Sequence, residues 1–179
     1  MTAMSTLHVP PDGWTVDDLP DDADARYELV DGALLVSPPE SARNTAIAGR
    51  LLVLLAPSVG PEWEVLVGGG CYFDNRNFRV PDLLVARRDA LDGVHLDVSD
   101  VLLAVEVMSP GSVSNDRVAK PAQYAAAGIP HFWRFERAPR VLVIHALDGD
   151  VYRETGRYDD RVDVALPVPL SFALTDLYD

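Results

Sequence analysis

Two carboxylates stand within or beside apolar runs that predict buried strands. Glu106 interrupts the apolar run 101–107, and Asp82 directly precedes the run 83–86. An unpaired ionised carboxylate in a dry interior costs several kcal/mol, so such a group is usually neutralised, paired with a cation or bound to a metal. A simpler interpretation of Glu106 is a carboxylate that points to water, because Ser109, Pro110 and Gly111 end the strand soon after it. The local sequence leaves both interpretations open.

The two carboxylates would meet at one end of a sheet if their strands were neighbours. Two close carboxylates repel each other and do not both stay ionised without a cation. Mg²⁺ or Mn²⁺ would meet this need, because each is a hard ion that binds through one or two carboxylates and keeps several waters. Water bound in this way is a nucleophile for a phosphodiester. Asp82 and Glu106 together therefore indicate metal-assisted hydrolysis.

A cation is expected next to this pair. The chain has a single lysine, Lys120, against fourteen arginines, which suggests that this position needs the compact ammonium group. Asp116, Lys120 and Tyr124 are spaced i, i+4, i+8, on one face of a predicted helix. Lys120 could position the attacking water or offset charge in the transition state. The alternative is an ordinary solvated ion pair between Asp116 and Lys120.

The elements that must position these residues follow from hydrophobic periodicity and from turn signals. The sequence predicts a mixed α/β fold in which a sheet is flanked by two main helices. The predicted helices cover residues 15–19, 41–56 and 114–127, the last capped by Ser114 or Asn115. The predicted strands cover residues 26–30, 33–36, 63–67, 71–73, 78–86, 101–107, 131–135, 141–146, 151–154 and 162–166.

Composition limits the class of protein. A chain of 179 residues with 48% hydrophobic and 24% charged residues predicts one globular domain, residues 1–179, in which residues 1–25 are loosely structured. The single cysteine, Cys71, allows no internal disulfide. The start of the chain lacks the basic and apolar segments of a signal peptide, and no run is long enough for a membrane span. We therefore expect a cytoplasmic protein.

The net charge of −13 argues against a general affinity for nucleic acid. The acidity is concentrated in the terminal segments, however. Residues 32–147 contain twelve acidic and eleven basic residues, a net charge of about −1. A locally neutral or basic site in the middle of the chain is therefore compatible with the composition.

Four blocks of sequence, taken in order, resemble one protein family. They are YELVDGALLVSPP at 27–39, VPDLLVA at 80–86, AVEVMSPGS at 104–112 and DRVAKPAQYAAAGIPHFW at 116–133. Their order and spacing are similar to those of the bacterial Uma family of putative restriction endonucleases, a branch of the PD-(D/E)XK restriction-endonuclease-like superfamily. The resemblance spans most of the chain.

The resemblance implies a restriction-endonuclease-like fold and roles for particular residues. Asp82 and Glu106 would bind Mg²⁺ or Mn²⁺, and Lys120 would be the catalytic lysine. In the parent motif that lysine follows the acid by two residues, where this chain has Met108. Glu28, in YELVDG, matches a family glutamate that adds a ligand or orients one. Asp116 and Tyr124 are candidate supporting residues.

The resemblance also implies a nucleic-acid substrate, DNA in the first instance, and no membrane partner. A homodimer is compatible with the superfamily and with the apolar run Leu52–Leu55. Two other functions remain open. One is a non-catalytic binding or assembly module that keeps the nuclease fold, favoured by the acidic charge and the missing basic stripe. The other is a metal-dependent hydrolase of small phosphate esters or short single strands.

Overall fold

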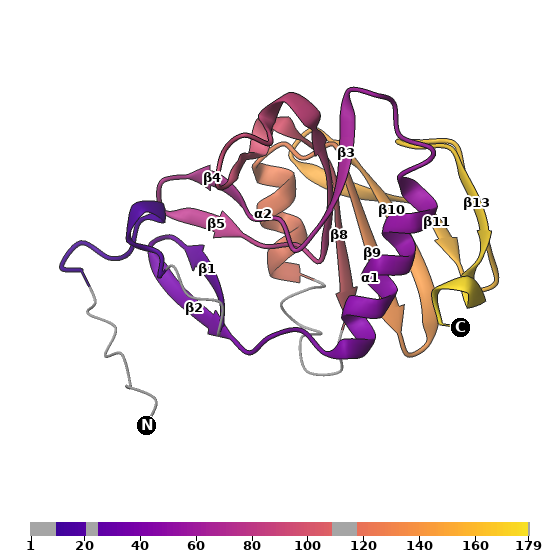
Figure 1. The fold of residues 1–179 in the computed structure, drawn as a ribbon, viewed down its shortest axis with the longest axis horizontal. Helices are drawn as coiled ribbons and strands as arrows, with labels where there is room; N and C mark the ends of the chain where they lie inside the picture. The colour runs from indigo at the N-terminus through magenta and orange to yellow at the C-terminus, as the bar shows by residue number, and fades with distance from the viewer. Residues whose placement is uncertain (1–9, 21–24, 109–117, 179) are drawn as a thin grey trace.

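The computed structural model describes residues 10–20, 25–108 and 118–178. Its two larger sheets lie side by side, the five-stranded sheet toward the N-terminus and the six-stranded sheet toward the C-terminus (Figure 1). In spatial order the six-stranded sheet contains β11 (Val151–Tyr158), β10 (Arg140–Asp148), β9 (His131–Arg137), β8 (Val101–Met108), β6 (Leu83–Arg87) and β3 (Trp63–Val67). The sheet is mixed, because β8 and β9 run parallel while its other neighbouring strands are antiparallel.

The five-stranded sheet carries the N-terminal hairpin. In spatial order it contains β2 (Ala33–Ser37), β1 (Arg26–Val30), β5 (Asn77–Arg79), β4 (Cys71–Asp74) and β7 (Leu96–Asp97). A two-stranded sheet, β12 (Arg161–Val164) and β13 (Leu170–Ala173), lies near the C-terminus. The remaining elements are the helices α1 (Ala42–Leu55) and α2 (Lys120–Ala126) and the 3₁₀ turns η1 (Val16–Asp18), η2 (Arg88–Ala90), η3 (Val98–Asp100) and η5 (Leu174–Leu177).

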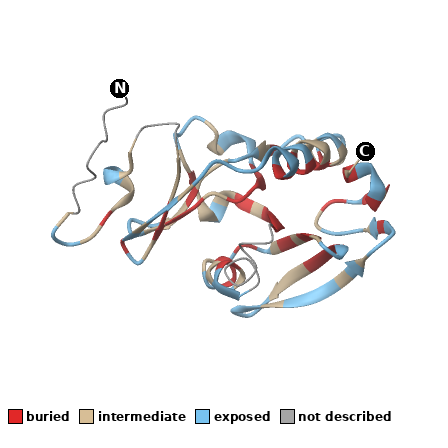
Figure 2. Ribbon diagram, turned by 90° about the horizontal axis from the view of Figure 1, so that it is seen from below, coloured by how far each residue is buried: buried red, intermediate tan, exposed pale blue. Residues whose placement is uncertain are grey.

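The six-stranded sheet separates two apolar layers, and β8 contributes to both. Leu103, Val105 and Val107 pack in the cluster that includes α1 and the two-stranded sheet. Ala104 packs on the opposite face, in the cluster that contains Tyr124 of α2. Side chains of a strand alternate between faces, so Glu106 belongs to the α2 face. Figure 2 shows the buried residues along these central strands, whereas β11 at the edge is mostly exposed.

Helix α1 is where the sequence predicts it. The Ser41 side chain caps the helix by accepting a hydrogen bond from the Asn44 backbone N–H at 3.2 Å. Ile47, Leu51 and Leu55 lie at the predicted i, i+4, i+8 positions and are fully buried. The helix therefore covers one face of the six-stranded sheet (Figure 1).

Helix α2 is the connection between the parallel strands β8 and β9. It begins at Lys120, six residues later than the predicted cap at Ser114, and Pro121 occupies its first turn. Proline is tolerated there because the first backbone N–H groups of a helix have no partner within the helix. Ser114, Asn115 and Asp116 lie outside the described residues.

The prediction of one strand over 78–86 is wrong. The structure forms two strands there, β5 and β6, and places them in different sheets. Pro81 has no backbone N–H for a ladder hydrogen bond, so the strand is interrupted at this residue. Asp82 consequently lies at the crossing between the two sheets, directly before Leu83 starts β6. The predicted mixed α/β class is confirmed, but the described residues form three sheets where the sequence predicts one.

The described part of the N-terminal segment packs on the hairpin. Trp14 is buried against Leu29 and Phe78, and its backbone N–H donates to the Gly32 carbonyl at 2.8 Å. No helix in the described parts of the chain is long and apolar enough to cross a membrane. In the run Leu52–Leu55, Leu55 is buried and Val53 is 68% exposed, so the homodimer stays a prediction.

Candidate active site between the two sheets

Asp82 and Glu106 lie at one level of two neighbouring elements, the adjacency on which the sequence-based prediction depends. Strand β6 pairs with β8 in a register that sets Leu83 opposite Val105, so Asp82 lies at the level of Glu106. The Asp82 side chain continues this pairing, because its Oδ2 accepts a hydrogen bond from the Val107 backbone N–H at 2.6 Å. Its backbone carbonyl accepts another from the Gly68 N–H at 3.1 Å. Asp82 thus connects β3, β6 and β8, and its side chain lies at the boundary between the two larger sheets, which we call the seam.

Glu106 is buried and paired with a cation. The Lys120 Nζ lies 2.8 Å from Glu106 Oε1, and the two side chains are only 6% and 3% exposed. The Tyr124 hydroxyl donates to the same oxygen at 2.6 Å. Lys120 and Tyr124 are four residues apart on α2, so both side chains leave the same helix face. The alternative of a water-facing Glu106 is therefore wrong.

Glu28 lies in the same buried cluster, on the five-stranded sheet. Its register opposite β5, set by the Leu29–Phe78 pair, places it beside Arg79, and the two side chains meet at 3.0 Å. The other Glu28 oxygen accepts the Val80 backbone N–H at 3.1 Å and lies 3.7 Å from Lys120 Nζ. Both oxygens of Glu28 are thus in use, which favours an orienting role over metal ligation.

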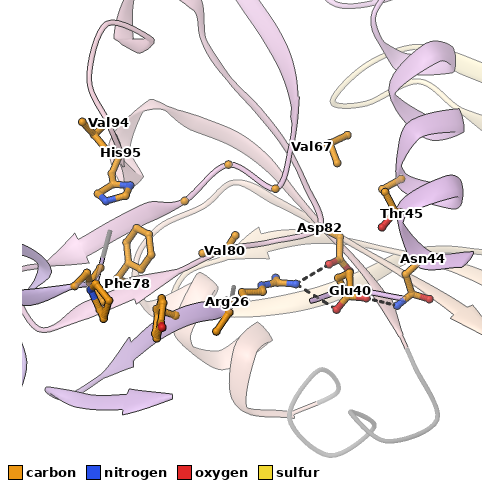
Figure 3. Close-up of a pocket in the computed structure, with 18 of the residues that line it drawn as sticks. Arg26, Glu40, Asn44, Thr45, Val67, Phe78, Val80, Asp82, Val94 and His95 are labelled. Carbon is orange, nitrogen blue, oxygen red and sulfur yellow. Dashed lines mark hydrogen bonds and ion pairs between the residues drawn. The ribbon is translucent and has the colours of Figure 1, made fainter. Parts of the chain in front are cut away.

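Arg26 places a guanidinium among the carboxylates. Its Nη1 lies 3.0 Å from Asp82 Oδ1 and 3.3 Å from Glu40 Oε1 (Figure 3). Its Nη2 lies 3.9 Å from Glu28 Oε1. Its Nε and Nη2 are buried and donate no hydrogen bond to any residue that the structure describes. An unsatisfied buried donor costs about 1–3 kcal/mol. Arg26 is therefore held mainly by its ion pairs with the carboxylates, because its set of hydrogen bonds is incomplete.

A second layer of hydrogen bonds supports the end of β8. The Asn44 side-chain amide donates to the Val107 carbonyl at 2.9 Å and to Glu40 Oε2 at 2.8 Å. The Arg137 guanidinium donates to the amide oxygen of Asn44 at 2.9 Å. Asn44 thereby ties α1 to the strand that carries Glu106.

Burial and charge shift the pKa values of the site in opposite directions. Burial raises the pKa of Asp82 and of Glu106 above the usual carboxyl range, and their cations do not fully offset it. For Glu28, burial is outweighed by Lys120, Arg79 and Arg26, so its pKa is lowered. Burial also works against the Lys120 ammonium, but Glu106 and Glu28 outweigh it and raise the pKa. The raised pKa keeps the Lys120 side chain in its ammonium form at neutral pH.

The donor chemistry fits a hard divalent cation. Asp82 and Glu106 offer carboxylate oxygens, which Mg²⁺ and Mn²⁺ prefer. Glu106 Oε2 accepts no hydrogen bond from any residue that the structure describes, so it can serve as a ligand. Within the described ranges, no group of three His, Cys, Asp or Glu side chains is arranged as a metal site. The ion pair of Arg26 with Asp82 Oδ1 is the contact that a bound cation would have to replace.

An open cleft of about 810 Å³ gives access to this seam (Figure 3). Asp82, Arg26 and Glu40 line one side of it, whereas Phe78 and His95 line another. Backbone of the glycine run 68–70 also lines the cleft, so little side-chain bulk fills it there. The cleft is within the size range of pockets that bind small ligands.

The structure brings together five of the six residues predicted for the site. Asp82, Glu106, Lys120, Tyr124 and Glu28 share one buried cluster, and Asp116 lies outside the described residues. The cations Arg26 and Arg79 of this cluster were not predicted from the sequence. A signal for Arg26 was present, because Arg26 and Glu28 are two residues apart on a strand and so share a face.

Comparisons with known proteins agree with this architecture. The family model Uma2, described as "Putative restriction endonuclease", matches residues 15–176. The crystal structure of a putative nuclease belonging to DUF820 from Anabaena variabilis ATCC 29413 is similar, with a TM-score of 0.68 and 18% sequence identity, over 92% of this chain and 97% of that chain. At that identity the likeness concerns the fold alone. No functionally curated protein matches the chain.

Proposed function

The chain belongs to the Uma2 family of putative restriction endonucleases, and from this premise we propose that it is a divalent-metal-dependent nuclease. It hydrolyses phosphodiester bonds of nucleic acid, with DNA as the first substrate to test. The observation that carries the proposal is the buried pair Asp82 and Glu106 at one level of two adjacent strands, with the Lys120 ammonium on Glu106. An ion pair with no function beyond surface charge would need neither the burial of these residues nor the strand register that sets the two acids at one level.

Asp82 and Glu106 hold the Mg²⁺ or Mn²⁺ ion in this proposal. When bound, the ion supplies an activated water and withdraws charge from the phosphoryl group. Asp82 can give Oδ1 to this task while Oδ2 keeps the hydrogen bond from the Val107 N–H. Glu106 can give Oε2 while Oε1 stays with Lys120 and Tyr124. In each acid, one carboxylate oxygen thus keeps its hydrogen bonds within the protein while the other can bind the metal ion.

Lys120 contributes a fixed positive charge. A preorganised cation in a site of low dielectric stabilises the negative charge that develops on the phosphoryl oxygens. Glu28 is a positioning residue, because it lies 3.7 Å from Lys120 and pairs with Arg79. Tyr124 keeps Glu106 in place by donating to Oε1. With its pKa raised well above 10 by burial and by Glu106, the Tyr124 hydroxyl stays a donor.

The test is cleavage by the purified protein with Mg²⁺ or Mn²⁺, with and without chelator. Glu106→Gln and Lys120→Ala are each expected to reduce the rate by about a hundredfold or more, as is typical when one preorganised group is lost. Glu64→Gln is the matched control, since Glu64 is a β3 carboxylate paired with Arg88 on the surface. Unchanged metal-dependent cleavage in both site variants would overturn the assignment.

The choice of substrates addresses the alternative of a small-ester or single-strand hydrolase. The net charge of −13 disfavours the long phosphate contacts that duplex binding needs. Duplex DNA, single-stranded DNA, single-stranded RNA and a simple phosphate monoester should therefore be compared in parallel. Cleavage of none of them, by a protein that also binds no Mn²⁺, would favour the non-catalytic module.

A further inference from the structure

The carboxylates and cations of the buried cluster balance in charge before any metal binds, and the exposed Glu40 lies at the edge of this cluster, 3.3 Å from Arg26 Nη1. Three carboxylates, Glu28, Asp82 and Glu106, share the buried cluster with three cations. Lys120 pairs with Glu106 and Arg79 pairs with Glu28, which leaves Arg26 for Asp82. A divalent ion added to this balanced set would produce a buried excess of positive charge, which is unfavourable in a low dielectric.

Among these three cations Arg26 is the one least firmly held by hydrogen bonds. Arg79 donates to Glu28 at 3.0 Å and, through its Nε, to Gln123 at 2.9 Å. Within the described parts of the chain, Arg26 instead leaves Nε and Nη2 buried without a hydrogen-bond acceptor, while Nη1 donates to Asp82 and Glu40. Buried polar groups are nearly always satisfied, so each exception calls for an explanation.

Arg26 also lies on the route into the site. Both Arg26 and Asp82 line the open cleft, and Glu40 beside them is more exposed, at 38%. The guanidinium takes Asp82 Oδ1, the oxygen that is not already used by the Val107 N–H. A side chain at the wall of a cleft has space to move into, whereas Lys120 and Arg79 are enclosed by α2 and the strands.

We propose that Arg26 is a built-in counter-cation that occupies the carboxylate site in the metal-free protein and competes with the divalent ion for Asp82. This inference rests on the proposed metal site and deepens it. Arg26 keeps the buried acids compensated while no metal is present, and it leaves Asp82 when the ion enters. Metal affinity is therefore set by a competition between Arg26 and the ion, and not by the carboxylates alone.

Calorimetric titration with Mn²⁺, without nucleic acid, tests this directly. Arg26→Met is expected to bind Mn²⁺ at least about tenfold more tightly than the wild type, because it removes a full charge only a few Å from the acids. Arg26→Lys keeps the charge and is expected to stay close to the wild type. Arg50→Met is the control, since Arg50 donates to the Leu177 carbonyl and pairs with no carboxylate in the described structure.

Thermal unfolding of the same proteins provides the second readout. Without metal, Arg26→Met is expected to melt at a lower temperature than the wild type, and Mn²⁺ is expected to raise its melting temperature by a larger increment. Equal or weaker Mn²⁺ binding by Arg26→Met, beside a wild type that binds, would overturn the proposal. So would a lack of binding by both proteins.

A measurement on the wild type avoids dependence on a variant that unfolds. The Arg26 Nε–H signal in a nitrogen–proton NMR spectrum, identified by its loss in Arg26→Lys, is expected to shift when Mg²⁺ is added. An unshifted signal at saturating Mg²⁺ would overturn the proposal. Cleavage assays are read separately, so tighter Mn²⁺ binding by an inactive protein would support the Arg26 inference while refuting the nuclease proposal.

Discussion

Removal of the Lys120 ammonium should destabilise the fold far more than removal of a surface charge. The Nζ–Oε1 distance of 2.8 Å to Glu106 corresponds to a Coulomb attraction of about 6 kcal/mol at an effective dielectric constant of 20. The net cost of breaking such a buried pair from one side is about 3–5 kcal/mol, because the remaining charge stays buried without its partner. We expect Lys120→Met to lose this amount of the free energy of unfolding.

A double-mutant cycle separates the ion pair from packing. Glu106→Gln should cost less, about 1–3 kcal/mol, because Gln still offers an oxygen to the Tyr124 hydroxyl and Lys120 keeps Glu28 within 3.7 Å. The variant that combines both changes should lose less than the sum, since it contains no stranded charge at position 106. We expect the non-additive part to be about 2 kcal/mol.

Urea unfolding at pH 7 with chelator measures the cycle. Trp133, on β9 of the six-stranded sheet, is fully buried in the apolar cluster that includes α1, so its fluorescence should report loss of the core. A cycle on Glu64 and Arg88 is the comparison, and its coupling should lie below about 1 kcal/mol, as for other exposed pairs. A Lys120→Met cost under about 1 kcal/mol, or strict additivity with Glu106→Gln, would refute the view that this pair is buried and energetically coupled.

Three further predictions follow from single contacts. Glu28→Gln should lower the free energy of unfolding at pH 7. This loss should shrink as the pH falls below 4.5, because the lowered pKa of Glu28 adds stability only while its carboxyl group in the unfolded chain is ionised. Urea unfolding at several pH values checks this. Cys71 should not react with a thiol reagent until urea unfolds the chain, since burial raises its pKa to about 12; early reaction in a spectrophotometric assay would contradict this. Gly70→Ala should cost about 1–3 kcal/mol in thermal or urea unfolding, because the added Cβ would overlap the Phe78 ring. Gly69→Ala, whose Cβ would have ordinary 3.5 Å contacts, should cost much less.

Hydrophobic periodicity predicted the elements that are buried on one face or on all sides. Helix α1 has a single apolar stripe and a serine cap, and β3 and β8 are apolar runs, each containing one glutamate, between turn residues. The run 78–86 failed because its apolar pattern continues across a change of sheet, which only Pro81 signals. The short strands β7 and β13 have too few residues to give a period.

The acids and the lysine of the site could be predicted from the sequence, but the arginines that balance their charge could not. Asp82, Glu106 and Lys120 were recognisable because each contrasts with its surroundings: two acids at apolar strands and one lysine in an arginine-rich chain. Arg26 and Arg79 come from the other sheet. A strand pattern says which residues share a face, but it does not say which face of another sheet they will meet.

The division of the site between two sheets also orders events during synthesis. Glu28, Asp82 and Glu106 are all translated before Lys120, and β9, the parallel partner of β8, follows α2. A nascent or prematurely released chain that ends before α2 therefore contains the acids without their lysine. Strand pairings between distant parts of the chain form late and slowly. The four residues of the site can therefore come together only after most of the polypeptide has been synthesised. On the proposed mechanism, a fragment that ends before α2 lacks the lysine and is therefore expected not to cleave nucleic acid.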